Sequence, residues 1–578
     1  MLMSEAVRAR LRIMLGLFAV LSGLIVIRLV SLQFGSDVPY FEEQYITATG
    51  YLVKITPPRG KIYDRTGELL ATNDVKYAIG LSPDFVTDAE GLAKILSSVL
   101  GKPYEEMFAL TTTIPGPDNK YLLIERPAPA EIGEKLLALQ HDPNGPDLGG
   151  LIVEPMQTRV YPNGPLGANV LGFVSLDNRG YYGIEEYYND ILAGHEVVGI
   201  KQVVPFDVAL NPAPDHGADL YLTIDREIQA LTEKTLADAL RQYGAESGTI
   251  IVLEPNTGRI LAMAANPSFD PNNYLADPSA LKPNPAISDQ YEPGSTFKVL
   301  TMAAALQAGT VTPETTYQDT GYIEVGGVGI RNWDGGAWGT QDMTGALQHS
   351  LNVGMAWIST QMGPKAFYDY MTAFGIGQLT NVDLGGEATG RLKKPGDPDW
   401  YESDLGTNAF GQGVATTPLQ LIAAVSAIAN KGALMQPHFL ERVVDSDTVH
   451  TTQSQVLGRP ISADVAATLN EMLAVSVERE ASDALVPGYR LAGKTGTAEI
   501  PTPGGYDLDE TIASFIGWGP VDDPRFIVLI NLDKPTTSRW GSETAAPVFG
   551  VLVKRLVVLM NIPPDDVRHQ LQAQAAGQ

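Results

Sequence analysis

The sequence of 578 residues contains no cysteine, which excludes thiol nucleophiles, zinc sites built from thiolates and disulfide bonds. Basic residues are also scarce. There are 40 Lys and Arg against 67 Asp and Glu, which gives a formal net charge of −27. Because nucleic-acid binding needs basic patches that neutralise phosphates, we expect no nucleic-acid partner. A chain without cysteine also suits an extracytoplasmic protein that folds without oxidation, although many cytosolic proteins lack cysteine too.

Several enzyme motifs are missing as well. The zinc-hydrolase pattern His-Glu-x-x-His does not occur, and neither does the Gly-x-Ser-x-Gly of serine hydrolases. The seven histidines offer no obvious partner for a Ser-His-Asp triad, and His349, beside Ser350, is interpreted as incidental. The segment Gly411-Gln412-Gly413 lacks the third glycine of a dinucleotide-binding loop and predicts only a turn.

What remains is an ordinary globular composition with one long apolar segment near the start. From Ile13 to Phe34 the chain is apolar for roughly 20 residues, long enough to cross a bilayer if Arg28 snorkels. The run is long for a cleaved signal peptide and lacks an Ala-x-Ala-like site. The flanking charges place the N-terminus in the cytoplasm and the rest of the chain outside. These are Arg8, Arg10 and Arg12 before the segment and Asp37, Glu42 and Glu43 after it.

The length predicts at least two folded units after this segment. A change in pattern at Asn211–Gly217, rich in proline, indicates a linker. Beyond it, strands and helices alternate in a way that predicts an α+β domain with a mainly antiparallel sheet covered by helices. The predicted elements are a strand at 220–224, a helix capped by Asp225 and running to Tyr243, strands at 249–253 and 260–264 joined by a turn at 254–258, a strand at 526–532 and a helix at 548–560.

The segment Glu292–Lys298 holds the most informative serine. Pro293-Gly294 predicts a turn, and an apolar helix is expected from Ser295 to about residue 308. Ser295 and Lys298 are three residues apart, so they share a face of the first turn. A helix that is apolar nearly all round is buried, and burial lowers the pKa of a lysine, which makes Lys298 a candidate general base for Ser295.

This spacing alone is weak evidence, because Ser-x-x-Lys arises by chance in a chain this long. An N-terminal cap beside a solvated lysine is the simpler interpretation. Indeed a second copy exists at Ser279–Lys282, where Pro278 and Pro283 oppose a buried helix and predict a loop.

Two further motifs follow in order and favour Ser295 as a nucleophile. Ser350-Leu351-Asn352 and Lys494-Thr495-Gly496-Thr497 complete a known three-motif pattern of serine acyltransferases. The Ser350 hydroxyl can pass a proton between Lys298 and a leaving amine, and the Asn352 amide can hold a substrate backbone group.

The segment from Lys494 to Thr497 predicts a strand that binds a carboxylate. Thr495 and Thr497 share one face, and two hydroxyls with the Lys494 ammonium suit a carboxylate. Strict alternation along the strand places Lys494 on the face opposite to the two threonines. Either a twist of the strand brings Lys494 to the site, or Lys494 acts from the flank of the site, and the sequence leaves both open. Gly496 would allow close approach of a peptide-like substrate.

With these motifs the chain resembles the class B penicillin-binding proteins, over nearly all of its length after the apolar segment. Further segments look like motifs of that family's non-catalytic and transpeptidase domains. They are Arg59–Gly67, Arg159–Pro162, Gly183–Glu185 with Leu192–Gly194, and Gly411–Gly413 with Thr417–Gln420.

The resemblance implies a serine β-lactamase-like transpeptidase fold after an elongated pedestal domain of the dimerisation type. The expected organisation is a cytoplasmic tail at 1–10, a transmembrane anchor at 11–34, the pedestal at 35–210, the transpeptidase domain at 218–562 and a polar tail at 563–578. The expected location is the cytoplasmic membrane, crossed once, with the catalytic domain outside.

The resemblance also implies a mechanism and partners. Ser295 would attack the penultimate D-Ala of a peptidoglycan pentapeptide stem, with the backbone N–H groups of Ser295 and Thr497 as the oxyanion hole and no metal or organic cofactor. β-Lactams would acylate the same serine. A SEDS-family glycosyltransferase and other cell-wall synthesis proteins are the expected partners. Two segments look more like the division type of the family than the elongation type, namely Tyr291–Ser295 and Ser350–Gly354. The elongation type remains the alternative.

The sequence opposes four other functions. A β-lactamase would lack the anchor and pedestal, and a β-lactam sensor would carry a larger membrane module. A divisome scaffold without activity would not need the intact motifs. Gly488–Thr495 fits a phosphate-binding loop, but that motif needs a strand before it and a helix after it, and Pro487, Gly496 and Pro501 oppose both.

Overall fold

The computed structural model describes residues 5–34, 50–55, 57–114, 116, 120–202, 216–446, 448–502 and 505–576. The chain forms two compact units. One comprises Met1–Pro58 with Gly194–Gly217, and the other comprises Arg59–Ala193 with Ala218–Gln578. Most of the predicted linker, and the acidic residues predicted to flank the apolar segment, lie outside the described residues.

The first unit contains the apolar N-terminal segment, which forms the helix α1 (Glu5–Phe34). Within it, 12–31 is the one stretch of the described residues that is long and apolar enough to cross a membrane. The described side chains of this stretch are almost all exposed. The same unit contains an antiparallel pair of strands, β1 (Gly50–Ile55) and β8 (Val197–Gln202).

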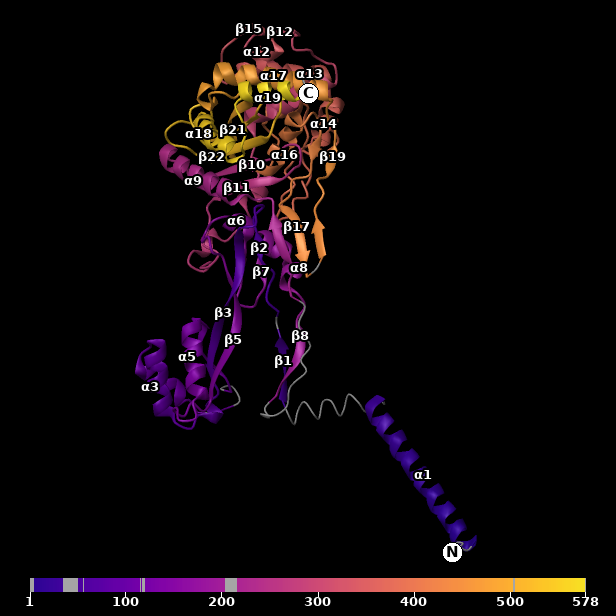
Figure 1. Ribbon diagram of the computed structural model, residues 1–578. Coiled ribbons are helices and arrows are strands. Elements are labelled where there is room, and N and C mark those ends of the chain that lie inside the picture. Colours follow the sequence, from indigo (N-terminus) through magenta and orange to yellow (C-terminus); the bar gives the residue numbers. More distant parts are fainter. Residues whose placement is uncertain are drawn as a thin grey trace. The chain divides into compact units, whose positions relative to one another are not determined.

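The second unit is built around a five-stranded sheet (Figure 1). Its order is β11-β10-β22-β21-β20, and every neighbouring pair is antiparallel, as the sequence predicts. β20, the strand of the Lys494 motif, lies at one edge, so one side of its backbone has no neighbouring strand in this sheet. The strands are β10 (Ser247–Leu253), β11 (Ile260–Asn266), β20 (Ala492–Thr502), β21 (Gly505–Gly519) and β22 (Phe526–Asp533).

Helices cover both faces of this sheet, which explains why β22 is a continuous apolar run. Val528, Ile530 and Leu532 pack in one core with the helices α9 (Arg226–Tyr243) and α18 (Ala545–Leu559). Ile527 and Leu529 face the opposite core. That second core is formed with α11 (Lys298–Gln307), α13 (Asn352–Met362), α16 (Pro418–Ala429) and α17 (Ala463–Glu480).

Local signals in the sequence placed several elements correctly. The Asp225 carboxylate caps α9 by accepting from the N–H groups of Glu227 and Ile228, and Gly244 ends the helix at a φ of 62°.

One predicted strand belongs to a different sheet. Residues 219–222 form β9, which joins a separate seven-stranded sheet with the order β18-β17-β9-β2-β3-β4, where β5 also pairs with β3.

The part of this unit between residues 77 and 151 has its own small core between sheet and helices. Its long strands are β3 (Leu69–Leu81), β4 (Leu122–Ala128) and β5 (Leu151–Val160). The helices against them are α3 (Ala89–Leu100), α4 (Tyr104–Thr111) and α5 (Ala130–His141).

Short elements complete the unit. Before β9 they are β2 (Ile62–Tyr63), η1 (Pro83–Phe85), α6 (Ala168–Leu171), β6 (Phe173–Val174), β7 (Gly180–Tyr181), α7 (Gly183–Tyr187) and α8 (Asn189–Ala193). After β9 (Asp219–Leu222) they are η2 (Pro278–Ala280), α10 (Pro285–Ser288), η3 (Gly294–Phe297), β12 (Thr316–Asp319), β13 (Tyr322–Val325), β14 (Val328–Arg331), β15 (Gly339–Asp342), α12 (Met343–Gln348), α14 (Pro364–Ala373), α15 (Glu402–Asn408), β16 (Leu434–Met435), β17 (Leu440–Asp445), β18 (Thr448–Thr451), β19 (Val456–Gly458) and η4 (Ser482–Ala484).

The segment predicted as a polar tail is largely helical. Residues Asp565–Ala576 form α19. Arg568 fixes this helix to the domain, since its guanidinium donates to both carboxylate oxygens of Asp522 at 2.7 and 2.5 Å. The polar composition of the segment therefore reflects an exposed docked helix.

A buried ion network joins three of the segments that carry the family resemblance. Glu185 is fully buried, and its two oxygens accept from Arg59 Nε at 2.7 Å and from Arg159 Nε at 2.6 Å. The Arg59 guanidinium also donates to the backbone oxygen of Glu185, and Arg159 donates to that of Gly60 at 2.7 Å. One carboxylate thus balances two buried cations that lie far from it in the sequence.

Removing this carboxylate should destabilise the protein strongly. In Glu185→Ala two guanidinium groups stay buried without a counter-charge, which costs about 3–5 kcal/mol of unfolding free energy. The check is the urea midpoint of the purified chain in detergent. Glu90→Ala serves as a matched control, because Glu90 pairs with Lys94 on the exposed surface and should barely change the midpoint. Equal midpoints for the two variants would contradict the assigned role of the network.

Candidate active site

Ser295 lies on a tight turn rather than in the regular helix that the sequence predicts. Residues Gly294–Phe297 form a 3-10 turn, and the α-helix begins only at Lys298. Side chains three residues apart eclipse each other in a 3-10 turn, which brings Ser295 and Lys298 to the same side. Gly294 has a φ of 55°, and its N–H donates to the backbone oxygen of Gly411 at 3.1 Å. The turn is therefore fixed against a segment more than a hundred residues away.

Lys298 connects the first two motifs. Its side chain is fully buried, and Nζ donates to the Ser350 backbone oxygen at 2.6 Å, to Ser350 Oγ at 3.2 Å and to Asn352 Oδ1 at 2.8 Å. The predicted meeting of Lys298 with Ser350 is present. Asn352 was expected only to hold substrate, and the structure adds that it positions the lysine.

The surroundings of Lys298 make its amine a weaker base than an ordinary lysine. Burial lowers its pKa well below the usual 10.5, and the nearby positive charge of Lys494 lowers it further. The three accepting oxygens favour the ammonium form and oppose these effects. The neutral amine that a general base requires is therefore more accessible in Lys298 than in an ordinary lysine.

Ser350 has a strained backbone. Its φ of 55° is left-handed, which is uncommon outside glycine, asparagine and aspartate. It joins α12 to α13, and this conformation turns both its carbonyl and its hydroxyl toward Lys298. Asn352 is held in turn by donating from Nδ2 to the Arg331 backbone oxygen at 3.1 Å. No sequence pattern signalled the strain at Ser350.

Lys494 lies near Lys298, although its side chain belongs to the face of β20 opposite to Thr495 and Thr497. Along β20, Thr495 and Thr497 are partly exposed, whereas Lys494 and Gly496 are buried, so strict alternation holds. Lys494 Nζ nevertheless lies 3.3 Å from Thr495 Oγ1 and donates to the Thr495 backbone oxygen at 3.2 Å. Burial lowers the pKa of Lys494 to about 8, against the smaller opposite effect of Glu480.

Neighbouring residues explain how the Thr497 hydroxyl is oriented and why a glycine occupies position 496. Thr497 Oγ1 accepts from the Gly541 N–H at 3.2 Å, which orients the hydroxyl. A Cβ added to Gly496 would lie 2.3 Å from Ser514 Oγ and 2.9 Å from Thr296 Cγ2. The close packing of the Ser295 turn on β20 thus suffices to explain this glycine, and its predicted contact with substrate stays a prediction.

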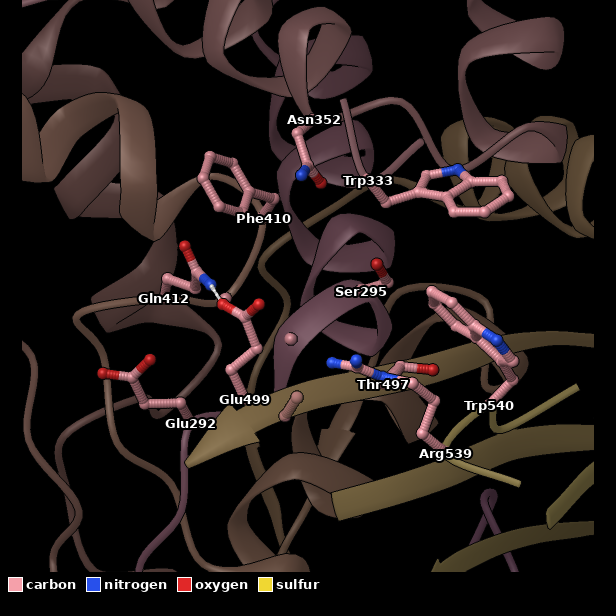
Figure 2. A pocket seen from close by; sticks show the side chains of 13 residues that line it. Glu292, Ser295, Trp333, Asn352, Phe410, Gln412, Thr497, Glu499, Arg539 and Trp540 are labelled. Carbon is pink, nitrogen blue, oxygen red and sulfur yellow. Dashed lines mark hydrogen bonds between the residues drawn. The ribbon is translucent and has the colours of Figure 1, made fainter. Parts of the chain in front are cut away.

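Two clefts meet at Ser295. The first, of about 400 Å³, is bordered by Ser295, Asn352 and Thr497 (Figure 2). Figure 2 shows Glu292, Gln412 and Glu499 on one side of Ser295 and Trp333 and Trp540 on the other. The charged residues of this cleft are Glu292, Glu499 and Arg539. Glu292 begins the segment of Ser295, but the sequence assigned it no chemistry, and Glu499 and Arg539 belong to no motif.

The second cleft, of about 450 Å³, lies along Ser295, Ser350 and Thr495 and is rich in aromatic rings. Trp338 stacks on His349 at 4.2 Å between ring centroids, and Trp333 meets Trp540 edge-on at 5.4 Å. His349, interpreted from the sequence as incidental, therefore lines the cleft, with its Nδ1 3.2 Å from Glu480 Oε1.

The competing motifs do not form sites of their own. Ser279 is exposed on a single 3-10 turn, where its Oγ donates to Asp277 at 2.5 Å, and Lys282 lies 4.0 Å from Asp289. The phosphate-loop pattern ends inside β20, where a strand follows in place of the required helix. Within the described part of the chain, no group of three or more histidine, aspartate or glutamate side chains is placed to hold a metal ion.

Comparison with protein families matches two domains. Residues 248–554 match the penicillin-binding protein transpeptidase domain. Residues 54–206 match the penicillin-binding protein dimerisation domain.

Related proteins match over most of this chain. Stage V sporulation protein D of Bacillus subtilis is 34% identical over 88% of this chain and 79% of its own length. Peptidoglycan D,D-transpeptidase FtsI of Escherichia coli is 30% identical over 89% of this chain and 85% of its own length. The crystal structure of penicillin-binding protein 3 from Mycobacterium tuberculosis, complexed with ampicillin, has 27% identity and a TM-score of 0.69 over 89% of this chain and 97% of that one.

Proposed function

Since the chain belongs to the class B penicillin-binding proteins and is a peptidoglycan D,D-transpeptidase, we propose that it cross-links stem peptides through an acyl-enzyme on Ser295. The observation that carries this proposal is the position of Lys298 Nζ. It lies within hydrogen-bond distance of Ser350 and Asn352, and Lys298 follows Ser295 by three residues. Ser295 itself borders the same cleft as Ser350 and Thr495 of the Lys494 strand.

In the first half-reaction Ser295 Oγ attacks the penultimate D-Ala carbonyl and gives its proton to neutral Lys298. The N–H groups of Ser295 and Thr497 stabilise the oxyanion, and Lys494, Thr495 and Thr497 bind the terminal carboxylate. When the tetrahedral intermediate collapses, the amine of the terminal D-Ala leaves with a proton that Lys298 returns through the Ser350 hydroxyl.

In the second half-reaction an amine from a neighbouring stem attacks the acyl-enzyme. Its proton passes to Lys298, which is neutral again after the first step. The amide bond forms, and Ser295 Oγ recovers a proton as it leaves. β-Lactams acylate Ser295 in the same way, with no amine expelled.

Product analysis tests this proposal. A peptide ending in D-Ala-D-Ala, mixed with an acceptor amine, should release one D-Ala for each cross-linked product when the intact chain is present. The measurements are D-Ala release and mass spectrometry of the products. Release of D-Ala with water alone as acceptor would indicate a hydrolase, and no release of D-Ala together with no labelling by penicillin would contradict the proposal.

Septal wall synthesis is the role that we propose in the cell, with elongation as the alternative. The segments Tyr291–Ser295 and Ser350–Gly354 support the division type. A fluorescent fusion should form a band at midcell in dividing cells, whereas foci along the lateral wall would favour elongation. The anchor α1 would place the N-terminus in the cytoplasm and the catalytic domain outside, where a SEDS-family glycosyltransferase is the proposed partner.

The two buried lysines predict a bell-shaped pH dependence of acylation by penicillin. The rate should rise with pH as Lys298 loses its proton, through a pKa well below 10.5, and fall as Lys494 loses its charge near pH 8. In Lys494→Gln the loss of a neighbouring cation favours the ammonium of Lys298, so the rise should move to higher pH. Stopped-flow acylation rates measure both limbs. An unmoved rise in this variant would contradict the coupling of the two lysines.

A further inference from the structure

Asp319, at the end of β12, is a buried carboxylate that borders neither cleft. It is 1% exposed, and its Oδ1 accepts from the N–H groups of Gly321 at 2.9 Å and Trp338 at 3.3 Å. Its Oδ2 accepts from Tyr317 Oη at 3.0 Å. Asn332 Nδ2 donates to both carboxylate oxygens, at 2.9 and 3.1 Å. Hydrogen bonds from neutral donors therefore hold this carboxylate in the core.

Asn332 connects Asp319 to the first turn of α13. It is 4% exposed, and its Oδ1 accepts from the Val353 N–H at 3.1 Å. The first N–H groups of a helix have no partner within the helix, so this bond fixes where α13 begins. The preceding residue, Arg331, accepts through its backbone oxygen from Asn352, the last residue of the second motif. The second motif and the helix after it are thus bound to the same short segment.

The other partners of Asp319 also contact residues next to the second motif. The ring of Trp338 stacks on His349 at 4.2 Å between centroids. Tyr317 packs on α13, since a Cβ added to Gly354 would lie 2.5 Å from the Tyr317 Oη. His349 comes directly before the second motif, and Gly354 comes two residues after it. One carboxylate therefore gathers three residues that hold the motif at both of its ends.

The second motif needs such support because its backbone is strained. Ser350 has a left-handed φ of 55°, a conformation that persists only where the surrounding structure imposes it. In this conformation the backbone oxygen and Oγ of Ser350 lie 2.6 and 3.2 Å from Lys298 Nζ. If the contacts around the motif were loosened, Ser350 would relax toward ordinary backbone angles, and Lys298 would lose these acceptors.

We infer that Asp319 is a positioning residue for acyl transfer, which holds Ser350 in its strained conformation through Asn332 and Trp338. The inference rests on the proposed function, because that function assigns proton transfer to Lys298 and Ser350. Asp319 lies outside both clefts, so it acts through its neighbours and not on the substrate.

Removing the carboxylate should change the pH dependence of acylation as well as its rate. In Asp319→Ala the ammonium of Lys298 loses oxygens that favour it, so the pKa of Lys298 falls further below 10.5. The rise of the acylation rate with pH should therefore move down by about one pH unit. The maximal rate should fall about 10–100-fold, because Ser350 is misplaced. Lys494, the charged neighbour that lowers the pKa of Lys298, is unchanged in this variant, and its own replacement moves the rise in the opposite direction.

Two further variants separate positioning from stability. Asn332→Ala cuts the link to α13 while Asp319 stays in place, and it should move the rise in the same direction, which decides the question if Asp319→Ala does not fold. Asp383→Ala is the matched control. Asp383 is 7% exposed and accepts from Tyr188 Oη at 2.9 Å and from two successive backbone N–H groups at 2.7 and 2.8 Å, but it borders neither cleft. Its removal should lower the melting temperature and leave the rise at the wild-type pH.

The measurement is the second-order rate constant for acylation by fluorescent penicillin, taken on the full chain in detergent across the pH range of both limbs. The pH of the rise does not depend on the active fraction of enzyme, so partial unfolding does not imitate the shift. A rise at the wild-type pH in both Asp319→Ala and Asn332→Ala, or an equal shift in Asp383→Ala, would overturn the inference while leaving the proposed function intact. Absence of labelling in the wild-type chain at every pH would instead contradict the proposed function.

Discussion

Replacing Ser295 by alanine should reduce covalent labelling by fluorescent penicillin more than about 10³-fold, because the attacking oxygen is removed. Ser295 is a half-buried residue on a short turn, and it borders both clefts. Labelling is measured on the purified full chain in detergent, by gel fluorescence against time.

The chain supplies a matched control for this change. Ser279 has the same Ser-x-x-Lys spacing, but it is exposed, and its Oγ bonds to Asp277. Ser279→Ala should label at the wild-type rate. Labelling of Ser295→Ala at a comparable rate, or loss of labelling in Ser279→Ala, would contradict the assignment of the nucleophile.

Replacing Lys298 by methionine should slow acylation by about 10²–10⁴-fold, the usual contribution of a general base. This corresponds to about 3–5 kcal/mol of transition-state stabilisation. Methionine preserves much of the buried apolar stem while it removes the amine that bonds to Ser350 and Asn352. The second-order rate constant for penicillin is the measurement.

Lys282→Met is the control for this variant, since Lys282 lies at the same spacing from Ser279 and pairs only loosely with Asp289. It should acylate as fast as the wild type. If Lys298→Met kept a rate within threefold of the wild type while its melting temperature was unchanged, another group would have to be the base.

Elements with strong local signals were predictable. The Asp225 cap, the turn at 254–258 and the apolar run of β22 fix structure through nearby chemistry, and all three are present. The helical content of α19 was not predictable, because its stability depends on the pairing of Arg568 with a loop at Asp522, 46 residues earlier. The sequence also did not reveal which sheet β9 joins, because its neighbours β17 and β2 lie far from it in the sequence.

Part of the candidate site was also predictable. The motif residues revealed which side chains could do chemistry, and Lys298 does meet Ser350 and Asn352. The left-handed backbone of Ser350 and the 3-10 turn at Ser295 have no sequence signal, because tertiary contacts impose them. Glu499 and Arg539 border one cleft only because β20 and the segment after β22 fold together.

Peptide mapping after penicillin treatment tests the central claim most directly. Trypsin should release residues 260–298 as one peptide, since Lys282 is followed by Pro283, and this peptide contains both Ser279 and Ser295. Fragment ions by tandem mass spectrometry assign the adduct to one of them. We predict that the whole adduct mass lies on Ser295, and an adduct on Ser279 or on any other peptide would contradict the claim that Ser295 is the nucleophile.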